Sequence, residues 1–99
     1  MERIYNTNIR VVWSAEKRQR NRTEHGLDFA DTVAVFEGPT FTFEDDRFAY
    51  GEIRLVTLGL LAGFPVSIAH TGNSHEIRII SFRKATTREA AIFFEACQK

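Results

Sequence analysis

Histidine is the side chain best suited to proton transfer near neutral pH, because its imidazole changes charge in that range. The chain contains three, His25, His70 and His75. His25 precedes Gly26 at the end of a basic segment, where its imidazole could transfer a proton or donate to a phosphate. The alternative is a structural histidine that interacts with the last carbonyl groups of a helix. The three histidines lie on different connections or strand ends, so we expect no metal site.

A second candidate group lies in the segment Glu-Ile-Arg-Ile-Ile-Ser-Phe-Arg-Lys near the C-terminus. The alternation of its residues predicts a strand in which Arg78 shares a face with Ile80 and Phe82. An isolated buried guanidinium is costly, so Arg78 must be paired or must line a cleft. Glu52 and Arg54 are the candidate partners. An ion-pair network that only braces the sheet is an equally good interpretation.

Caps, breakers and periodicity predict the elements that position these residues. Ser14 can cap a helix through Glu24, and Gly26 can end it in a left-handed conformation. Asp28 can cap a second helix, and Thr86 begins a capping box that starts a C-terminal helix. Strands are predicted at residues 9–13, 40–44, 53–60, 64–70 and 76–83. Because successive strands have short connections, we expect an α+β fold with an antiparallel sheet, two N-terminal helices and a C-terminal helix.

Size and composition indicate one small domain. The 99 residues, with a mass of 11.4 kDa, predict a single domain over residues 1–99, in which residues 1–8 could form a flexible tail. The chain has a single cysteine, Cys97, which excludes an intramolecular disulfide and favours a reducing compartment. We expect the Cys97 side chain to lie in the core. No apolar run is long enough to span a bilayer, so we expect no membrane partner and a cytoplasmic location.

Charge is distributed unevenly although the formal net charge is zero. Residues 1–23 carry a charge of +4, residues 24–52 a charge of −7 and residues 53–99 a charge of +3. The zero net charge of the whole chain gives no argument for nucleic-acid binding. Two basic ends could still form one anion-binding surface if the fold brings them together, while the acidic middle faces a basic partner.

Several motifs occur together in an order that resembles the BrnT family of type II toxins. They are Trp13 with Lys17 and Asn21, His25-Gly26, Gly51-Glu52-x-Arg54, Gly59, and the segment from Arg78 to Thr86 followed by Arg88-Glu89. The resemblance covers about residues 10–95. The sequence departs from the family pattern where Ser14-Ala15 replaces Asp-Pro, Phe82 replaces alanine, and Glu24 replaces the lysine before His-Gly.

The resemblance implies a RelE-like fold and metal-independent RNA cleavage without a cofactor. A base must take the 2′-hydroxyl proton, cations must stabilise the developing charge, and an acid must protonate the leaving oxygen. His25 and Glu52 are the alternatives for proton transfer. The implied catalytic residues are His25, Glu52, Arg54, Arg78 and Arg83, and the implied RNA-binding residues are Lys17, Lys84 and Arg88. In this scheme Arg54 would orient Glu52 or contact phosphate. Lys84 would support Arg78 and Arg83 as cations.

The resemblance also implies a partner, a BrnA-like antitoxin with a ribbon-helix-helix DNA-binding region. Operator DNA would then be contacted only through the antitoxin. The acidic residues Asp45 and Asp46 are candidates for contacting basic residues of the antitoxin. Glu24 supports an alternative, a catalytically weakened or inactive member that acts as a corepressor module for such a partner. A structural domain without catalysis is the third possibility.

Overall fold

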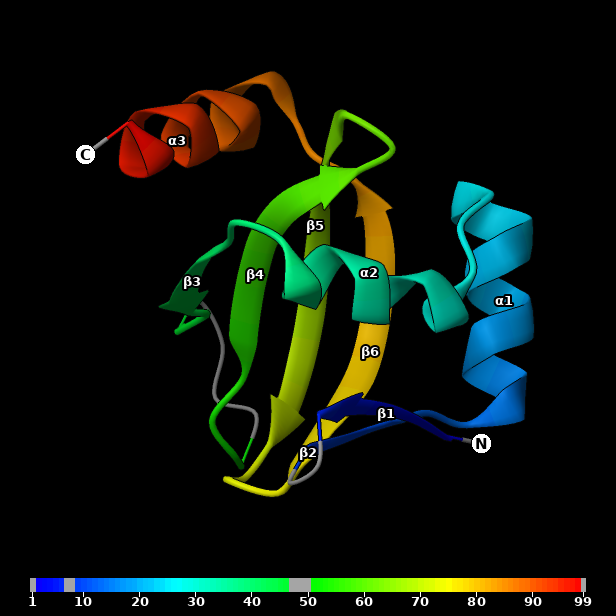
Figure 1. The fold of residues 1–99 in the computed structure, drawn as a ribbon. Helices are drawn as coiled ribbons and strands as arrows, with labels where there is room; N and C mark the ends of the chain where they lie inside the picture. The colour runs from blue at the N-terminus through cyan, green and yellow to red at the C-terminus, as the bar shows by residue number, and fades with distance from the viewer. Residues whose placement is uncertain (1, 7–8, 47–50, 99) are drawn as a thin grey trace.

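A computed structural model describes residues 2–6, 9–46 and 51–98 of the chain (Figure 1). The elements are β1 (Glu2–Asn6), β2 (Ile9–Val12), α1 (Ala15–His25), the 3-10 turn η1 (Phe29–Asp31), α2 (Thr32–Glu37), β3 (Phe41–Glu44), β4 (Leu55–Leu61), β5 (Phe64–Gly72), β6 (Glu76–Lys84) and α3 (Thr87–Cys97). The predicted α+β fold with two N-terminal helices and a C-terminal helix is confirmed. Strand β1 lies where the sequence suggested a flexible tail.

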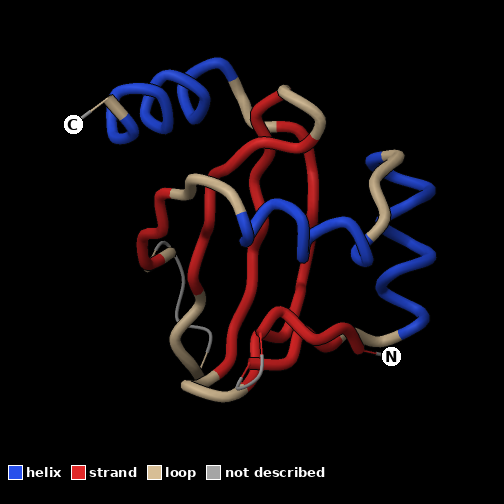
Figure 2. Tube along the Cα trace, in the orientation of Figure 1, coloured by secondary structure: helices blue, strands red, loops and turns tan. Residues whose placement is uncertain are grey.

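Six strands form one sheet in the order β1-β2-β6-β5-β4-β3 (Figure 2). The pairs β3–β4, β4–β5 and β5–β6 are antiparallel, as their connections predicted. Strand β2, however, pairs with β6 in parallel, with Val11 opposite Ile77, so the sheet is mostly antiparallel with one parallel pair that the sequence did not predict. Short connections fix the direction of consecutive strands only, and these two strands are far apart in the sequence.

Helices cover both faces of the sheet, but at different places. The buried cluster under η1 and α2 includes Phe29, Val35, Ile68 and Phe82. On the other face, Phe93 of α3 packs on the β4 side chains of a smaller cluster. Figure 1 shows α2 crossing the sheet, with α1 beside β6 and α3 toward β3 and β4. Helix α1 therefore lies at the β6 side of the sheet, and α3 lies toward β3 and β4.

Close packing of α2 depends on a glycine in β4. A Cβ atom on Gly59 would lie 2.6 Å from Cγ1 of Val35, which is too close for any side chain. The glycine therefore lets the helix approach the strand, one of the uses of glycine inside a sheet.

A β-bulge in β6 changes which side chains share a face. Ala69 of β5 pairs with Ser81 and His70 pairs with Ile79, which leaves Ile80 as an extra residue. As a result Phe82 joins Ile79 in the core under α2, whereas Arg78 is exposed on the other face. The prediction that Arg78 and Phe82 share a face is wrong, because strict alternation does not continue through a bulge.

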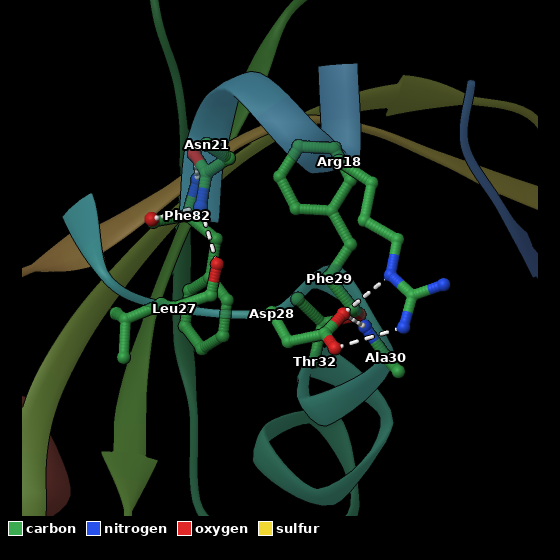
Figure 3. A network of polar contacts seen from close by, with 8 residues as sticks. All are labelled: Arg18, Asn21, Leu27, Asp28, Phe29, Ala30, Thr32 and Phe82. Carbon is green, nitrogen blue, oxygen red and sulfur yellow. Dashed lines mark hydrogen bonds and ion pairs between the residues drawn. The ribbon is translucent and has the colours of Figure 1, made fainter. Parts of the chain in front are cut away.

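One buried amide attaches α1 to the edge of β6 (Figure 3). The Asn21 side chain accepts from the Phe82 N–H at 3.0 Å and donates to the Phe82 carbonyl at 2.8 Å. It also donates to the Leu27 carbonyl at 3.0 Å. Asn21 is only 4% exposed, so it takes the place of a neighbouring strand at an edge that β2 is too short to cover.

The start of η1 is fixed by a capping aspartate, as the sequence predicted. The Asp28 carboxylate accepts from the Ala30 N–H and forms a two-bond ion pair with Arg18 of α1, at 2.8 and 2.9 Å (Figure 3). The hydrogen bonds from the Arg18 guanidinium are the main reason that the pKa of Asp28 falls to about 2. This carboxylate therefore joins α1 to the segment that packs on the sheet.

Replacing Asp28 by alanine should lower the free energy of unfolding by about 1 kcal/mol near neutral pH, the usual cost of a lost N-cap. Because the pKa is lower in the folded state, the charged carboxylate stabilises the protein above its ordinary pKa of 3.8 and loses this effect as the pH falls toward 2. Urea unfolding curves should therefore differ between wild type and variant at about pH 7 and converge at about pH 2. A difference that is independent of pH would contradict the assignment.

Candidate active site

An open cavity of about 240 Å³ lies between α1 and β6. Its lining residues are Lys17, Arg20, Asn21, Glu24, His25, Ile80 and Ser81. Five of these residues belong to α1. Neighbouring members of this set are three positions apart or adjacent, so all five lie on one side of the helix. Since Asn21 fixes that side against β6, the cationic and imidazole groups are held at the edge of the sheet.

His25 occupies the last turn of α1, and Gly26, with φ of 71°, ends the helix as predicted. The imidazole side chain is 34% exposed, so a substrate can reach it from solvent. Its Nε2 lies 3.8 Å from an oxygen of Glu24. Two cations, Lys17 and Arg20, line the same cavity, and Arg20 forms an exposed ion pair with Glu16 at 2.8 Å.

Two arginines of β6 lie on the sheet face opposite α2, and neither is among the residues that line this cavity. Arg78 pairs with Thr71, and Arg83 pairs with Ser67 of β5. Ile79 and Phe82 point into the core under α2, so Arg78 before the bulge and Arg83 after it point to the other face. Helix α1 from the basic N-terminal part therefore contacts β6 from the basic C-terminal part, although Arg78 and Arg83 lie outside the cavity that Lys17 and Arg20 line.

Both arginines have carboxylate partners that the sequence interpretation did not choose. Arg78 pairs with Glu76 on its own strand at 2.9 Å, and not with Glu52 as considered. Arg83 binds both oxygens of Glu89, at 2.8 and 3.0 Å. Burial acts to raise the pKa of Glu89, but the bonds from Arg83 and Thr86 outweigh it and the pKa is lowered. The Arg83 guanidinium is therefore held in one orientation by a charged partner.

The other predicted residues are more scattered. Glu52 is exposed and precedes β4 by three residues, and Arg54 is partly buried, with its carbonyl accepting from Asp45 N–H at 2.7 Å. Lys84 pairs with Val66, which places it on the face opposite Arg83, and its Nζ lies 5.5 Å from the centre of the Phe64 ring. Arg88 is exposed in the first turn of α3.

Sequence interpretation missed Arg20 as a cavity residue. The signal was present, because Arg20 follows Lys17 by three positions in a predicted helix. Cys97 was expected in the core but is exposed, since Phe93 and not Cys97 faces the sheet.

The remaining histidines do not contribute to the cavity. His70 is buried, its Nε2 lies 2.7 Å from the Thr57 hydroxyl, and burial lowers its pKa to about 4. His75 is exposed at the turn before β6. In the part of the chain that the structure describes, no group of three or more His, Cys, Asp or Glu side chains is arranged to hold a metal ion.

These features define a small α+β protein with a histidine-containing cavity between a basic helix and an arginine-bearing strand. Residues 13–89 match the family model described as the ribonuclease toxin BrnT of type II toxin-antitoxin systems. This match spans more than half of the chain, so the protein belongs to the BrnT family of ribonuclease toxins. No curated protein matched the sequence. None of the helices in the described ranges is long and apolar enough to cross a membrane.

Proposed function

We propose that this chain is a cytoplasmic endoribonuclease that cleaves RNA without a metal ion and is neutralised by a BrnA-like antitoxin. The observation that carries the proposal is the cavity between α1 and β6, in which His25 lies with Lys17 and Arg20. Cations attract the phosphodiester backbone, and an imidazole can act as the base toward the ribose 2′-hydroxyl.

In the proposed reaction, the ribose 2′-oxygen attacks the adjacent phosphorus and the bond to the 5′-oxygen breaks. The products are a 2′,3′-cyclic phosphate and a 5′-hydroxyl end. His25 takes the 2′-hydroxyl proton, and an acid returns a proton to the leaving oxygen. Between His25 and Glu52, the geometry favours His25, because Lys17 and Arg20 line its cavity, whereas Glu52 is exposed in the segment before β4.

Arg78 and Arg83 are proposed to stabilise the negative charge that develops on the phosphorane. Both belong to β6, the strand that lines the cavity through Ile80 and Ser81, and fixed cations contribute most where charge appears in the transition state. Glu89 holds Arg83 through two bonds, which reduces the reorganisation needed during the reaction. Lys17 and Arg88 are proposed RNA contacts. Arg54 and Lys84 keep only supporting roles in the proposal.

A second candidate function is favoured by the carboxylates around these groups. Glu24 adds negative charge to the cavity, and Arg78 and Arg83 each have an acidic partner. A member with weakened catalysis could serve as a corepressor module, which reaches operator DNA only through a ribbon-helix-helix antitoxin. The two functions differ in whether the free chain degrades RNA.

Replacing Glu24 by lysine should strengthen RNA binding, because it exchanges an anion for a cation in the cavity. We expect the affinity for single-stranded RNA to rise roughly tenfold at low salt and the gain to shrink as salt increases. Fluorescence anisotropy at several salt concentrations measures both effects. The control is Glu37→Lys at the end of α2, which makes the same change in net charge outside the cavity. Equal gains for the two variants would contradict a specific role for this cavity.

Induction of the chain in cells tests the proposed function. We expect growth arrest with RNA decay, relieved by the antitoxin encoded beside the gene for this chain. Arg78→Ala should abolish the arrest, whereas Arg22→Ala, an exposed α1 change outside the cavity lining, should not. A harmless chain that still binds its antitoxin would favour the corepressor module instead.

A further inference from the structure

An apolar groove lies between β3, the last strand of the sheet, and α3. One part of it, about 350 Å³, is lined by Phe41, Ile92, Glu95 and Ala96. Phe41 is 36% exposed and Ile92 is 37% exposed, although both are large apolar side chains. Exposed apolar surface with a polar rim is typical of sites that bind another macromolecule.

A second cavity, about 280 Å³, continues this groove. It is lined by Phe43, Glu44, Asp45, Asp46, Val56, Arg83 and Glu89. The rings of Phe41 and Phe43 are 6.1 Å apart, and Glu89, Ile92 and Ala96 follow one another along α3. The two cavities therefore form one groove, which we call the β3–α3 groove.

The described residues that line the β3–α3 groove carry a strong negative charge. They include five carboxylates and one guanidinium, Arg83, which is already paired with Glu89. Glu44, Asp46 and Glu95 are exposed on its rim. This charge disfavours RNA, whose phosphates would be repelled, and favours a partner that presents lysine or arginine beside apolar side chains.

We infer that the β3–α3 groove binds one amphipathic, basic segment of the antitoxin. This inference rests on the proposed function, which requires a protein antitoxin. Apolar side chains of the segment would contact Phe41 and Ile92, and its cations would pair with Glu44, Asp46 and Glu95. A helix laid between a strand and a helix can provide both sets of contacts from neighbouring faces.

The position of the groove suggests how binding inhibits cleavage. Arg83, a proposed catalytic cation, lines the end of the groove next to Glu89. A segment that fills this end would cover Arg83, whereas none of the residues that line the cavity containing His25 lines the groove. The antitoxin would thus remove one catalytic group without entering the basic cavity.

The test measures the affinity of the purified chain for the antitoxin encoded beside its gene, by titration calorimetry. Ile92→Arg should weaken binding roughly 30-fold, the effect of losing a central apolar contact. Glu95→Lys should weaken it roughly tenfold and reduce its dependence on salt. The matched controls are Ile53→Arg, at an isoleucine that is 66% exposed outside the groove, and Glu37→Lys on α2. Both should bind as wild type does.

Every outcome decides the inference. If wild type and both groove variants bind the antitoxin equally, the groove is not its site, although the toxin function stands. If wild type does not bind the antitoxin, the partnership itself fails. If the chain alone forms a dimer that Ile92→Arg dissociates, the groove is occupied by a second copy. Thermal unfolding of each variant, and retention of RNA cleavage by the groove variants, excludes misfolding as the cause of weaker binding.

Discussion

Replacing His25 by alanine is expected to lower the rate of RNA cleavage by roughly a hundredfold to ten-thousandfold. The reason is that His25 is the only histidine among the residues lining the α1–β6 cavity, and imidazole is the side chain that most often serves in general acid-base catalysis. Binding of RNA should change much less, since Lys17 and Arg20 keep their charges. Single-turnover cleavage of a labelled RNA, combined with a binding titration, separates the two effects.

The matched control for this experiment is His75→Ala, which removes an exposed imidazole from the turn before β6. Its cleavage rate should stay within about twofold of wild type, since surface changes away from the site have small effects. A His25→Ala variant with nearly wild-type activity would contradict the assignment. Loss of activity in Glu52→Gln would then point to the other candidate for proton transfer.

Replacing Asn21 by alanine is expected to destabilise the fold by roughly 2–4 kcal/mol. The change leaves the N–H and carbonyl of Phe82 without their side-chain partner, and Phe82 is completely buried. It also frees the Leu27 carbonyl. Asn21→Asp should be at least as damaging, because a carboxylate would face two carbonyl oxygens. Urea unfolding followed by circular dichroism measures both variants.

Gln19→Ala is the control for the Asn21 variants, because Gln19 is an exposed side chain on the same helix. It should change the free energy of unfolding by less than about 0.5 kcal/mol. If Asn21→Ala were equally mild, the amide would not be what attaches α1 to β6. Because α1 carries Lys17 and His25, we also expect the destabilised variant to lose RNA cleavage.

Local signals predicted much of the fold. Ser14 accepts from Lys17 N–H, Asp28 accepts from Ala30 N–H, and Thr86 and Glu89 form the predicted capping box. Each of these depends on residues no more than three positions apart, so the sequence contains the full pattern. The same is true of the turns between consecutive antiparallel strands.

Long-range features could not be predicted in this way. The parallel pairing of β2 with β6, and the bulge at Ile80, depend on contacts between distant segments. The bulge moved Phe82 to the core and left Arg78 exposed, which reversed an inference drawn from alternation. Of the candidate site, Lys17 and His25 could be placed together from one helix. Their approach to β6 depends on Asn21, which reaches a strand 61 residues away.

In the proposed mechanism the chain's own groups cleave RNA through the ribose 2′-hydroxyl. The most direct measurement incubates the purified chain with RNA, both free and on ribosomes, in excess EDTA, and identifies the fragment ends by mass spectrometry. We predict fragments with 2′,3′-cyclic phosphate and 5′-hydroxyl ends, and no cleavage of the same sequence made with 2′-deoxyribose. RNA that stays intact until Mg²⁺ is added, or equal cleavage of the deoxy strand, would contradict the account.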